Sequence, residues 1–287
     1  MQFEMLRIAA ALSFLGVATY YDLFNRKNVP VVIPYSMMLF GLILNLASLD
    51  INLILSSCGV ALVVLAIGYP IYKVGQIGGA DVLILAGIAL LLPDAPPALL
   101  PQAPAQPFFS YPFILPVFIV SGFLAVLGFS AEYIPRTLSS ALRGGVEVKA
   151  QSVLSSALIV VAYITVVYLF LQAGILSAAQ SAFLLILVLL AGFLTLFKDH
   201  ISSTMVEWVP LKEIDEEDVI ALHMLDPKIV SRLRLQPVLT HSEMEKLKKT
   251  RLKRFPVFKG MPPFLPYVLL AVVLLLAFGD PIALLFT

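Results

Sequence analysis

Long apolar runs follow one another along almost the whole chain, and this feature limits the fold more than any other. A membrane-spanning helix needs about 20 consecutive apolar residues, because the hydrocarbon core of a bilayer is about 30 Å thick. The 287 residues contain eight such runs, one of them short. They cover residues 5–21, 31–49, 53–72, 81–93, 113–131, 153–172, 178–197 and 262–287. The sequence therefore predicts an all-α polytopic membrane protein with about eight transmembrane helices.

The composition excludes several other classes of protein. Hydrophobic residues make up 60% of the chain and charged residues 13%, whereas a soluble domain carries about 25% charged residues. The net charge of +1 provides no basic surface for a nucleic acid. A single cysteine excludes a disulfide framework and a cysteine metal site, and three histidines disfavour a histidine metal site. We therefore expect no metal, no cofactor and no nucleic-acid partner.

The basic residues indicate how the chain is oriented. If all eight runs cross the membrane, the loops alternate between its two sides, and 18 of the 19 Lys and Arg residues fall on one side. Only Arg7 falls on the other side. The positive-inside rule makes the basic side cytoplasmic. We therefore expect a multi-pass protein of the cell membrane with both termini and the proline-rich loop 93–112 outside.

The apolar runs also divide the chain into parts. Residues 1–131 form the expected membrane core with five spans, and residues 132–197 form a polar loop followed by an extra transmembrane hairpin. The only long polar stretch, 198–261, is expected to form a small mixed cytoplasmic domain, and 262–287 is the C-terminal transmembrane helix.

The polar stretch carries local signals of its own. Thr240-His241-Ser242-Glu243 has the form of a capping box and predicts a helix over residues 242–251. Residues 219–222 and 255–258 predict short strands or extended segments. The acidic run 213–218 is typical of a solvated turn, and the alternative is that it captures a basic segment of a substrate.

Two acidic residues stand out because of their places at the ends of spans. Charged residues beside a membrane span are unfavourable and therefore informative. Asp22 follows the first run and Asp81 opens the fourth, with two runs between them. Since one of these runs leads out and the other leads back, both carboxylates are expected at the cytoplasmic face. On composition alone, simple helix termination is an equally good interpretation of both.

The residues before Asp81 are small. Gly78 and Gly79 allow close approach of another backbone, so an extended segment there could lie beside a peptide substrate. A flexible turn between two spans is the alternative. Asp81 opens a helix, where the dipole favours an anion, so we expect Asp81 to be the ionised member of a pair with Asp22. That preference is only about 0.3–1 kcal/mol and does not settle which carboxyl holds a shared proton.

Together, two segments resemble the catalytic motifs of a known family. Tyr21-Asp22 followed by Asn28-Val29-Pro30, and Gly78-Gly79-Ala80-Asp81 followed by Leu83, resemble the two motifs of type IV prepilin peptidases, whose archaeal branch includes the preflagellin peptidases. Parts of residues 239–266 look like the C-terminal region of the archaeal proteins. Ala80 stands where many relatives carry glycine, and the hairpin 153–197 lies outside the resemblance.

The resemblance implies a membrane aspartyl endopeptidase with Asp22 and Asp81 as the catalytic residues. Gly78, Gly79 and Ala80 would lie beside the bound substrate. The partners would be the lipid bilayer and a prepilin-like or preflagellin (archaellin) precursor, cleaved at the cytoplasmic face just before its hydrophobic segment. Two carboxylates that share one proton can activate a water molecule and protonate the leaving amine, so this chemistry requires no metal and no cofactor.

Two other functions fit parts of the sequence. An intramembrane aspartyl protease of the presenilin and signal-peptide-peptidase type has a similar pair of motifs, but its aspartates lie within the bilayer. Its Pro-Ala-Leu motif is only loosely similar to Pro263-Phe264-Leu265-Pro266, and we interpret Phe264 and Leu265 as packing of the last span. A proton-coupled transporter would use Asp22 and Asp81 as proton carriers. A transporter favours an acid at the midplane and an inverted repeat, and the sequence has neither.

Overall fold

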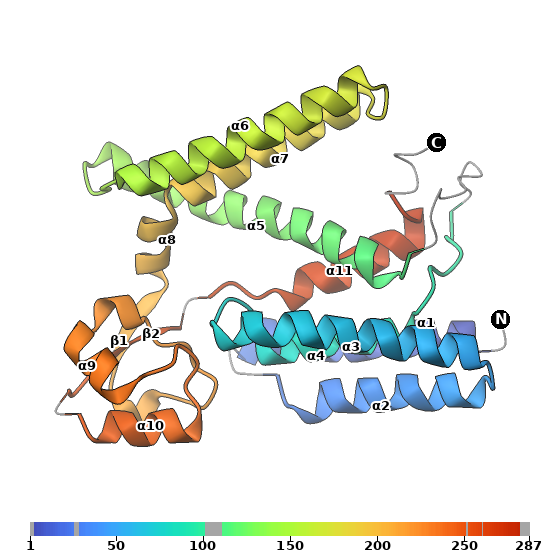
Figure 1. The fold of residues 1–287 in the computed structure, drawn as a ribbon, viewed down its shortest axis with the longest axis horizontal. Coiled ribbons are helices and arrows are strands. Elements are labelled where there is room, and N and C mark those ends of the chain that lie inside the picture. Colours follow the sequence, from blue (N-terminus) through green and yellow to red (C-terminus); the bar gives the residue numbers. More distant parts are fainter. Residues whose placement is uncertain (1–2, 26–28, 101–110, 251, 260, 282–287) are drawn as a thin grey trace.

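The computed structural model describes residues 3–25, 29–100, 111–250, 252–259 and 261–281. Eight long helices within these residues follow the eight apolar runs, and Figure 1 shows their arrangement. They are α1 (Glu4–Tyr20), α2 (Val32–Ala47), α3 (Ile51–Lys73), α4 (Gly79–Leu91), α5 (Ile114–Leu142), α6 (Ala150–Gln172), α7 (Ala178–Leu196) and α11 (Leu265–Phe278). The expected helical class is therefore confirmed.

The number of spans is less certain than the number of helices. Four helices, α3, α5, α6 and α7, are by themselves long and apolar enough to cross a membrane. The helices α2, α4 and α11 are apolar but have only 16, 13 and 14 residues. At 1.5 Å per residue α4 is about 20 Å long, less than the hydrocarbon thickness. The helices indicate a multi-pass membrane protein, and the count of eight spans stays a prediction.

Helix α4 lies against α1, α2 and α3 and is the most buried helix of this bundle (Figure 1). Every residue from 84 to 92 is buried. Glycines on its neighbours allow this close packing. A Cβ on Gly41 of α2 would lie 2.9 Å from the Cβ of Leu90, and one on Gly68 of α3 would lie 2.4 Å from Cγ1 of Val82. These contacts fix α4 against both neighbours and so fix the position of Asp81 in its first turn.

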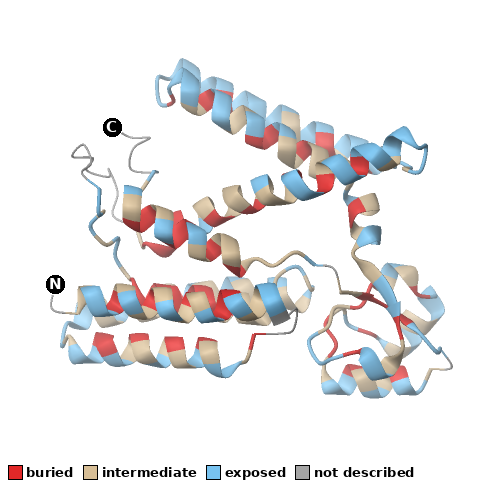
Figure 2. Ribbon diagram, turned by 180° about the vertical axis from the view of Figure 1, so that it is seen from behind, coloured by how far each residue is buried: buried red, intermediate tan, exposed pale blue. Residues whose placement is uncertain are grey.

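The helices α5, α6 and α7 form a second group. The helices α6 and α7 form the expected hairpin, which turns at Gly174 with φ of 70°. Helix α7 packs on α5, and α5 packs on α11. Figure 2 shows that the hairpin leaves most of its surface exposed, and the exposed side chains are largely apolar, as expected for lipid contact.

One expectation about this group is wrong. The sequence placed a polar connection directly after the fifth run, from residue 132, but α5 continues as a helix to Leu142. The polar residues there suit a helix that extends beyond the apolar layer, because Arg136 and Glu132 form an ion pair of 2.9 Å one turn apart on its exposed face.

The stretch before α11 forms a small unit with its own hydrophobic core around Leu239, Leu247 and Phe255. The strands β1 and β2 pair antiparallel, with Val206 opposite Phe258, so the expected mixed character is confirmed. Its elements are α8 (Lys198–Thr204), β1 (Val206–Val209), the 3₁₀ turns η2 (Leu211–Glu213) and η3 (Leu222–Met224), α9 (Pro227–Leu233), α10 (His241–Lys248) and β2 (Phe255–Phe258).

Two local predictions in this unit need correction. Of the short strand or extended segment expected over 219–222, Val219 and Ile220 form only isolated bridges, and the partner of β2 is the four-residue strand β1. The helix expected over 242–251 exists as α10, but it ends at Lys248. Thr240 caps it by accepting the N–H of Glu243. The Glu243 carboxylate instead accepts the N–H of Gln236 and pairs with Lys246, so the described hydrogen bonds do not complete the capping box.

The unit lies against the end of α3 that leads into α4 (Figure 1). The chain leaves α3 through Gly75, whose φ of 78° strongly favours glycine. A Cβ at this glycine would lie 2.9 Å from Cγ1 of Val219. The small unit and the segment before Asp81 are therefore neighbours. Of the proline-rich loop, the described residues 93–100 and 111–112 contain no helix or strand, as expected, and residues 101–110 lie outside the described part.

Candidate active site

Asp22 lies at a point where α1 changes its winding. After Tyr20 the helix continues into a wider π-helical turn, η1 (Tyr21–Asn25), which contains Asp22. π-helical turns are rare in proteins overall, but those that occur are often at functional sites. The Oδ2 atom of Asp22 accepts the backbone N–H of Leu265 at 3.0 Å, and the nearby backbone N–H of Phe264 also favours the charged form of this carboxylate. Asp22 is therefore held by the first residues of α11.

Asp81 lies in the first turn of α4. Its Oδ2 atom accepts the backbone N–H of Gly78, the residue before the helix, at 3.1 Å. This contact satisfies one of the N–H groups that a helix start leaves without an intrahelical partner. It also directs the carboxylate toward the segment that precedes the helix, on the side of the small unit.

The small residues before Asp81 are required for space rather than for unusual backbone angles. Gly78 is extended, with φ of −69° and ψ of 146°. A Cβ on it would lie 2.8 Å from Oδ2 of Asp81, and a Cβ on Gly79 would lie 3.2 Å from the ring of Tyr72. Ala80 lies inside α4, where its φ is negative, so alanine at this position causes no backbone strain. Contact of these three residues with a substrate stays a prediction.

The structure brings the two aspartates to the same end of the bundle. They come from the end of α1 and the start of α4, both are partly buried, and their carboxyl groups interact electrostatically. Each carboxylate also faces the N-terminus of a helix, α11 for Asp22 and α4 for Asp81. The helix-dipole argument therefore no longer distinguishes the two residues. The sequence alone does not indicate that the start of α11 lies beside Asp22.

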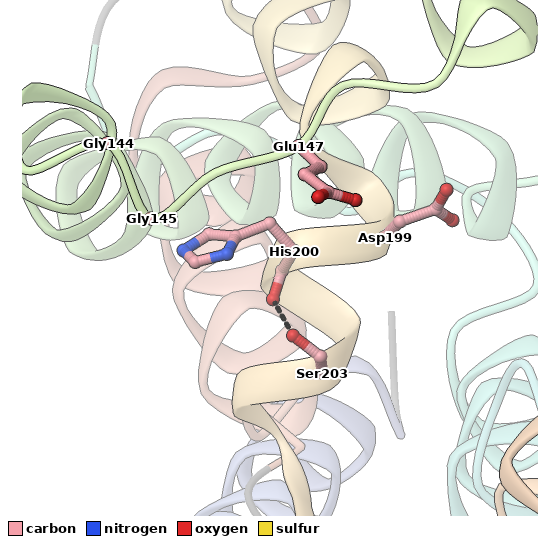
Figure 3. Close-up of a pocket in the computed structure, with 6 residues that line it drawn as sticks. All are labelled: Gly144, Gly145, Glu147, Asp199, His200 and Ser203. Atoms are coloured by element: carbon pink, nitrogen blue, oxygen red, sulfur yellow. Dashed lines mark hydrogen bonds between the residues drawn. The ribbon is translucent and has the colours of Figure 1, made fainter.

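A concave region lies away from Asp22 and Asp81. Figure 3 shows the residues that line an open depression. Its volume is about 440 Å³, and neither Asp22 nor Asp81 lines it. The hydrogen bond from Lys149 lowers the pKa of the Asp199 carboxyl at its edge. Its lining residues are Gly144, Gly145, Glu147, Asp199, His200 and Ser203. Among the described residues, no group of three or more His, Cys, Asp or Glu side chains is suited to hold a metal ion.

Comparison with known families concerns the part of the chain that contains Asp22 and Asp81. The sequence profile of the type IV leader peptidase family matches residues 9–131. This part includes Asp22, Asp81 and the segment 78–81, so the resemblance seen in the motifs is confirmed at the level of the family. No curated protein and no solved structure matches the chain.

This match supports a type IV leader peptidase-like protease, and the family implies prepilin-like substrates. The matched residues stop within α5. The hairpin of α6 and α7, the small unit and α11 all lie outside them. Phe264 and Leu265, whose backbone N–H groups face Asp22, therefore lie in a part of the chain outside the family match.

Proposed function

We propose that this protein is an aspartyl endopeptidase of the cytoplasmic membrane face that removes the short basic leader from prepilin-like or preflagellin precursors. The observation that carries the proposal is the placement of Asp22 and Asp81. Two partly buried carboxyl groups from separate helices interact with each other at one end of the family-matched bundle. A pair of this kind is the catalytic unit of aspartyl proteases.

The chemistry follows from the repulsion of like charges. Two carboxylates in close proximity do not both ionise readily, so the pair retains one proton near neutral pH. The ionised carboxylate takes a proton from a water molecule, which attacks the carbonyl carbon of the peptide bond. The protonated carboxyl stabilises the developing oxyanion and then supplies the proton for the leaving amine. Both groups end the cycle with one shared proton between them.

The position of the pair suits the proposed substrate. A prepilin-like precursor carries a basic leader before a hydrophobic helix, and cleavage falls between these two parts. The pair lies at the helix ends beside the small polar unit. A precursor could therefore place its hydrophobic helix in the bilayer and its cleavage site beside the carboxylates.

Removal of either carboxylate tests the proposal. In membranes that contain a prepilin-like or preflagellin precursor, Asp22→Asn and Asp81→Asn should each lower cleavage by about 1,000-fold or more, because neither amide can transfer the proton. The matched control is Asp50→Asn. Asp50 caps α3 by accepting the N–H groups of Asn52 and Leu53, and asparagine retains the accepting oxygen. This variant should cleave at the normal rate.

Gel mobility of the precursor measures cleavage, and membrane extraction with immunoblotting checks that each variant inserts to the normal amount. Cleavage above about one tenth of the normal rate in either active-site variant, in the presence of a normal amount of protein, would rule out the two-aspartate mechanism.

A further inference from the structure

The segment that leads into α11 has few backbone donors. Three of its five residues from 262 to 266 are prolines, Pro262, Pro263 and Pro266, and proline has no backbone N–H. Only Phe264 and Leu265 can donate there. The N–H of Leu265 donates to the carboxylate of Asp22, and the N–H of Phe264 lies near enough to stabilise its charge. At most helix starts such groups bond to water or to a nearby capping side chain. Here the acceptor lies 243 positions away in the sequence.

The packing around this turn holds it in place. The side chain of Leu265 is completely buried, and α11 contacts both α1 and the η1 turn that contains Asp22. Two residues further along, Tyr267 packs edge to face on Phe129 of α5. Its hydroxyl fits over Gly128, where an added Cβ would lie only 2.2 Å away. The absence of a side chain at position 128 therefore lets the start of α11 approach as closely as it does.

We propose that the first turn of α11 is a positioning element of the active site: the backbone N–H groups of Phe264 and Leu265 orient the carboxylate of Asp22 toward Asp81. The inference rests on the proposed function, since it assumes that Asp22 takes part in catalysis. It assigns a role to a segment outside the family-matched residues. It also replaces the interpretation of Phe264 and Leu265 as simple packing residues.

Leu265→Pro tests the proposal, because it deletes the N–H while proline suits the first position of a helix. Leu265→Ala loses the same buried side chain but retains the N–H. In cleavage assays with a precursor peptide in detergent, Leu265→Pro should lower kcat about 10- to 100-fold further than Leu265→Ala, with a similar KM. The acid limb of its pH–rate profile should move to higher pH, because the Asp22 carboxylate loses a donor that stabilises its charge. Asp81 is the charged group that interacts with Asp22 there.

A proline at an unrelated helix start serves as the control. Ala150 is the first residue of α6, and Lys149 before it is extended with ψ of 142°, a conformation that suits a following proline. Ala150→Pro should retain normal kcat and the normal pH–rate profile. This control separates loss of the donor from a general effect of an added proline.

A second pair of variants covers the case in which Leu265→Pro does not fold. Phe264 has α-helical angles, which a following proline disfavours. Gly128→Ala retains every N–H but forces the ring of Tyr267 away, so it should lower kcat about tenfold or more through displacement of α11. Adding Tyr267→Leu removes the atoms that meet the new Cβ and should restore most of kcat.

The outcomes separate this inference from the proposed function. If the normal protein cleaves and Asp22→Asn does not, yet Leu265→Pro matches Leu265→Ala in kcat and pH–rate profile, α11 does not position Asp22 and the inference is wrong. Normal kcat in Gly128→Ala, or no recovery with Tyr267→Leu, contradicts it as well. If Asp22→Asn itself cleaves normally, the proposed function fails first.

Discussion

Gly78 is required because it has no side chain. Its backbone is extended, a conformation open to most residues, so conformational freedom does not explain the glycine. The explanation is the Asp81 carboxylate, which turns back over it to accept its N–H at 3.1 Å. Any side chain at position 78 would occupy the space that this oxygen needs. The glycine and the orientation of the aspartate are therefore one feature.

This reasoning gives a prediction at the residue scale. Gly78→Ala should lower kcat about tenfold or more, because the methyl group displaces the Asp81 carboxylate, which the proposed mechanism requires in this position. Gly59→Ala in α3 is the matched control, since a Cβ there meets nothing within 4 Å. Steady-state cleavage of a precursor peptide by both purified variants measures the effect. Equal loss in the two variants, or loss in neither, would show that the space over Gly78 is unimportant.

At the scale of elements, α4 depends on a buried polar network at the end opposite to Asp81. A helix leaves its last carbonyl groups without intrahelical partners, and α4 ends among apolar neighbours. Arg7 of α1 donates to the carbonyl of Leu91 at 3.2 Å and to Oδ1 of Asn45 at 2.6 Å. Asn45 of α2 donates to the carbonyl of Leu90 at 3.0 Å and to Ser57 of α3 at 2.8 Å. Four helices thus meet at the end of the short helix.

Asn45 is the centre of this network, so its replacement should lower the stability of the protein. Asn45→Leu leaves the Arg7 guanidinium short of an acceptor and the Leu90 carbonyl short of a donor. We expect the free energy of unfolding in detergent to fall by about 2–4 kcal/mol. Asn52→Leu, an exposed residue at the start of α3, should change it by less than about 0.5 kcal/mol. Denaturant titration measures the free energy of unfolding of both variants. A similar decrease in both would contradict a structural role for the network.

At the scale of the whole molecule, the basic residues predict which end of the bundle faces the cytoplasm. In a Cys58→Ala background, a cysteine in place of Ala173, at the turn between α6 and α7, should react with a membrane-impermeant maleimide in intact cells. A cysteine in place of Glu213, in the small unit, should react only after the cells are made permeable. The reverse pattern would place the aspartates outside, and the proposed cytoplasmic cleavage would then be wrong.

Much of this architecture can be predicted from the sequence, because most of the helices coincide with long apolar runs. Apolar runs mark the helices, and counting two crossings between Asp22 and Asp81 correctly puts both at one end of the bundle. The exact helix ends are harder, since α5 continues through charged residues that read as a loop. The four-residue strand β1 follows directly on helical residues and has too short a pattern to detect.

The contact between α11 and Asp22 escapes sequence reasoning for a different reason. Its donors are backbone N–H groups, which every residue except proline carries, so Phe264 and Leu265 show no chemical signal of their own. The only signal is the three prolines around them, which leave two donors in five residues. That spacing indicates scarce donors but not their acceptor. Only the packing of α11 against the end of α1 identifies Asp22 as their partner.

The separation of 243 positions between Asp22 and Leu265 also determines when the site is complete. A ribosome makes the chain from its N-terminus, so α1 to α4 and both aspartates enter the bilayer while α11 is still untranslated. During that interval Asp22 lacks the backbone donor that Leu265 supplies in the full chain. If α11 positions Asp22 as we propose, a growing chain therefore completes this site only after residue 265 has emerged and docked.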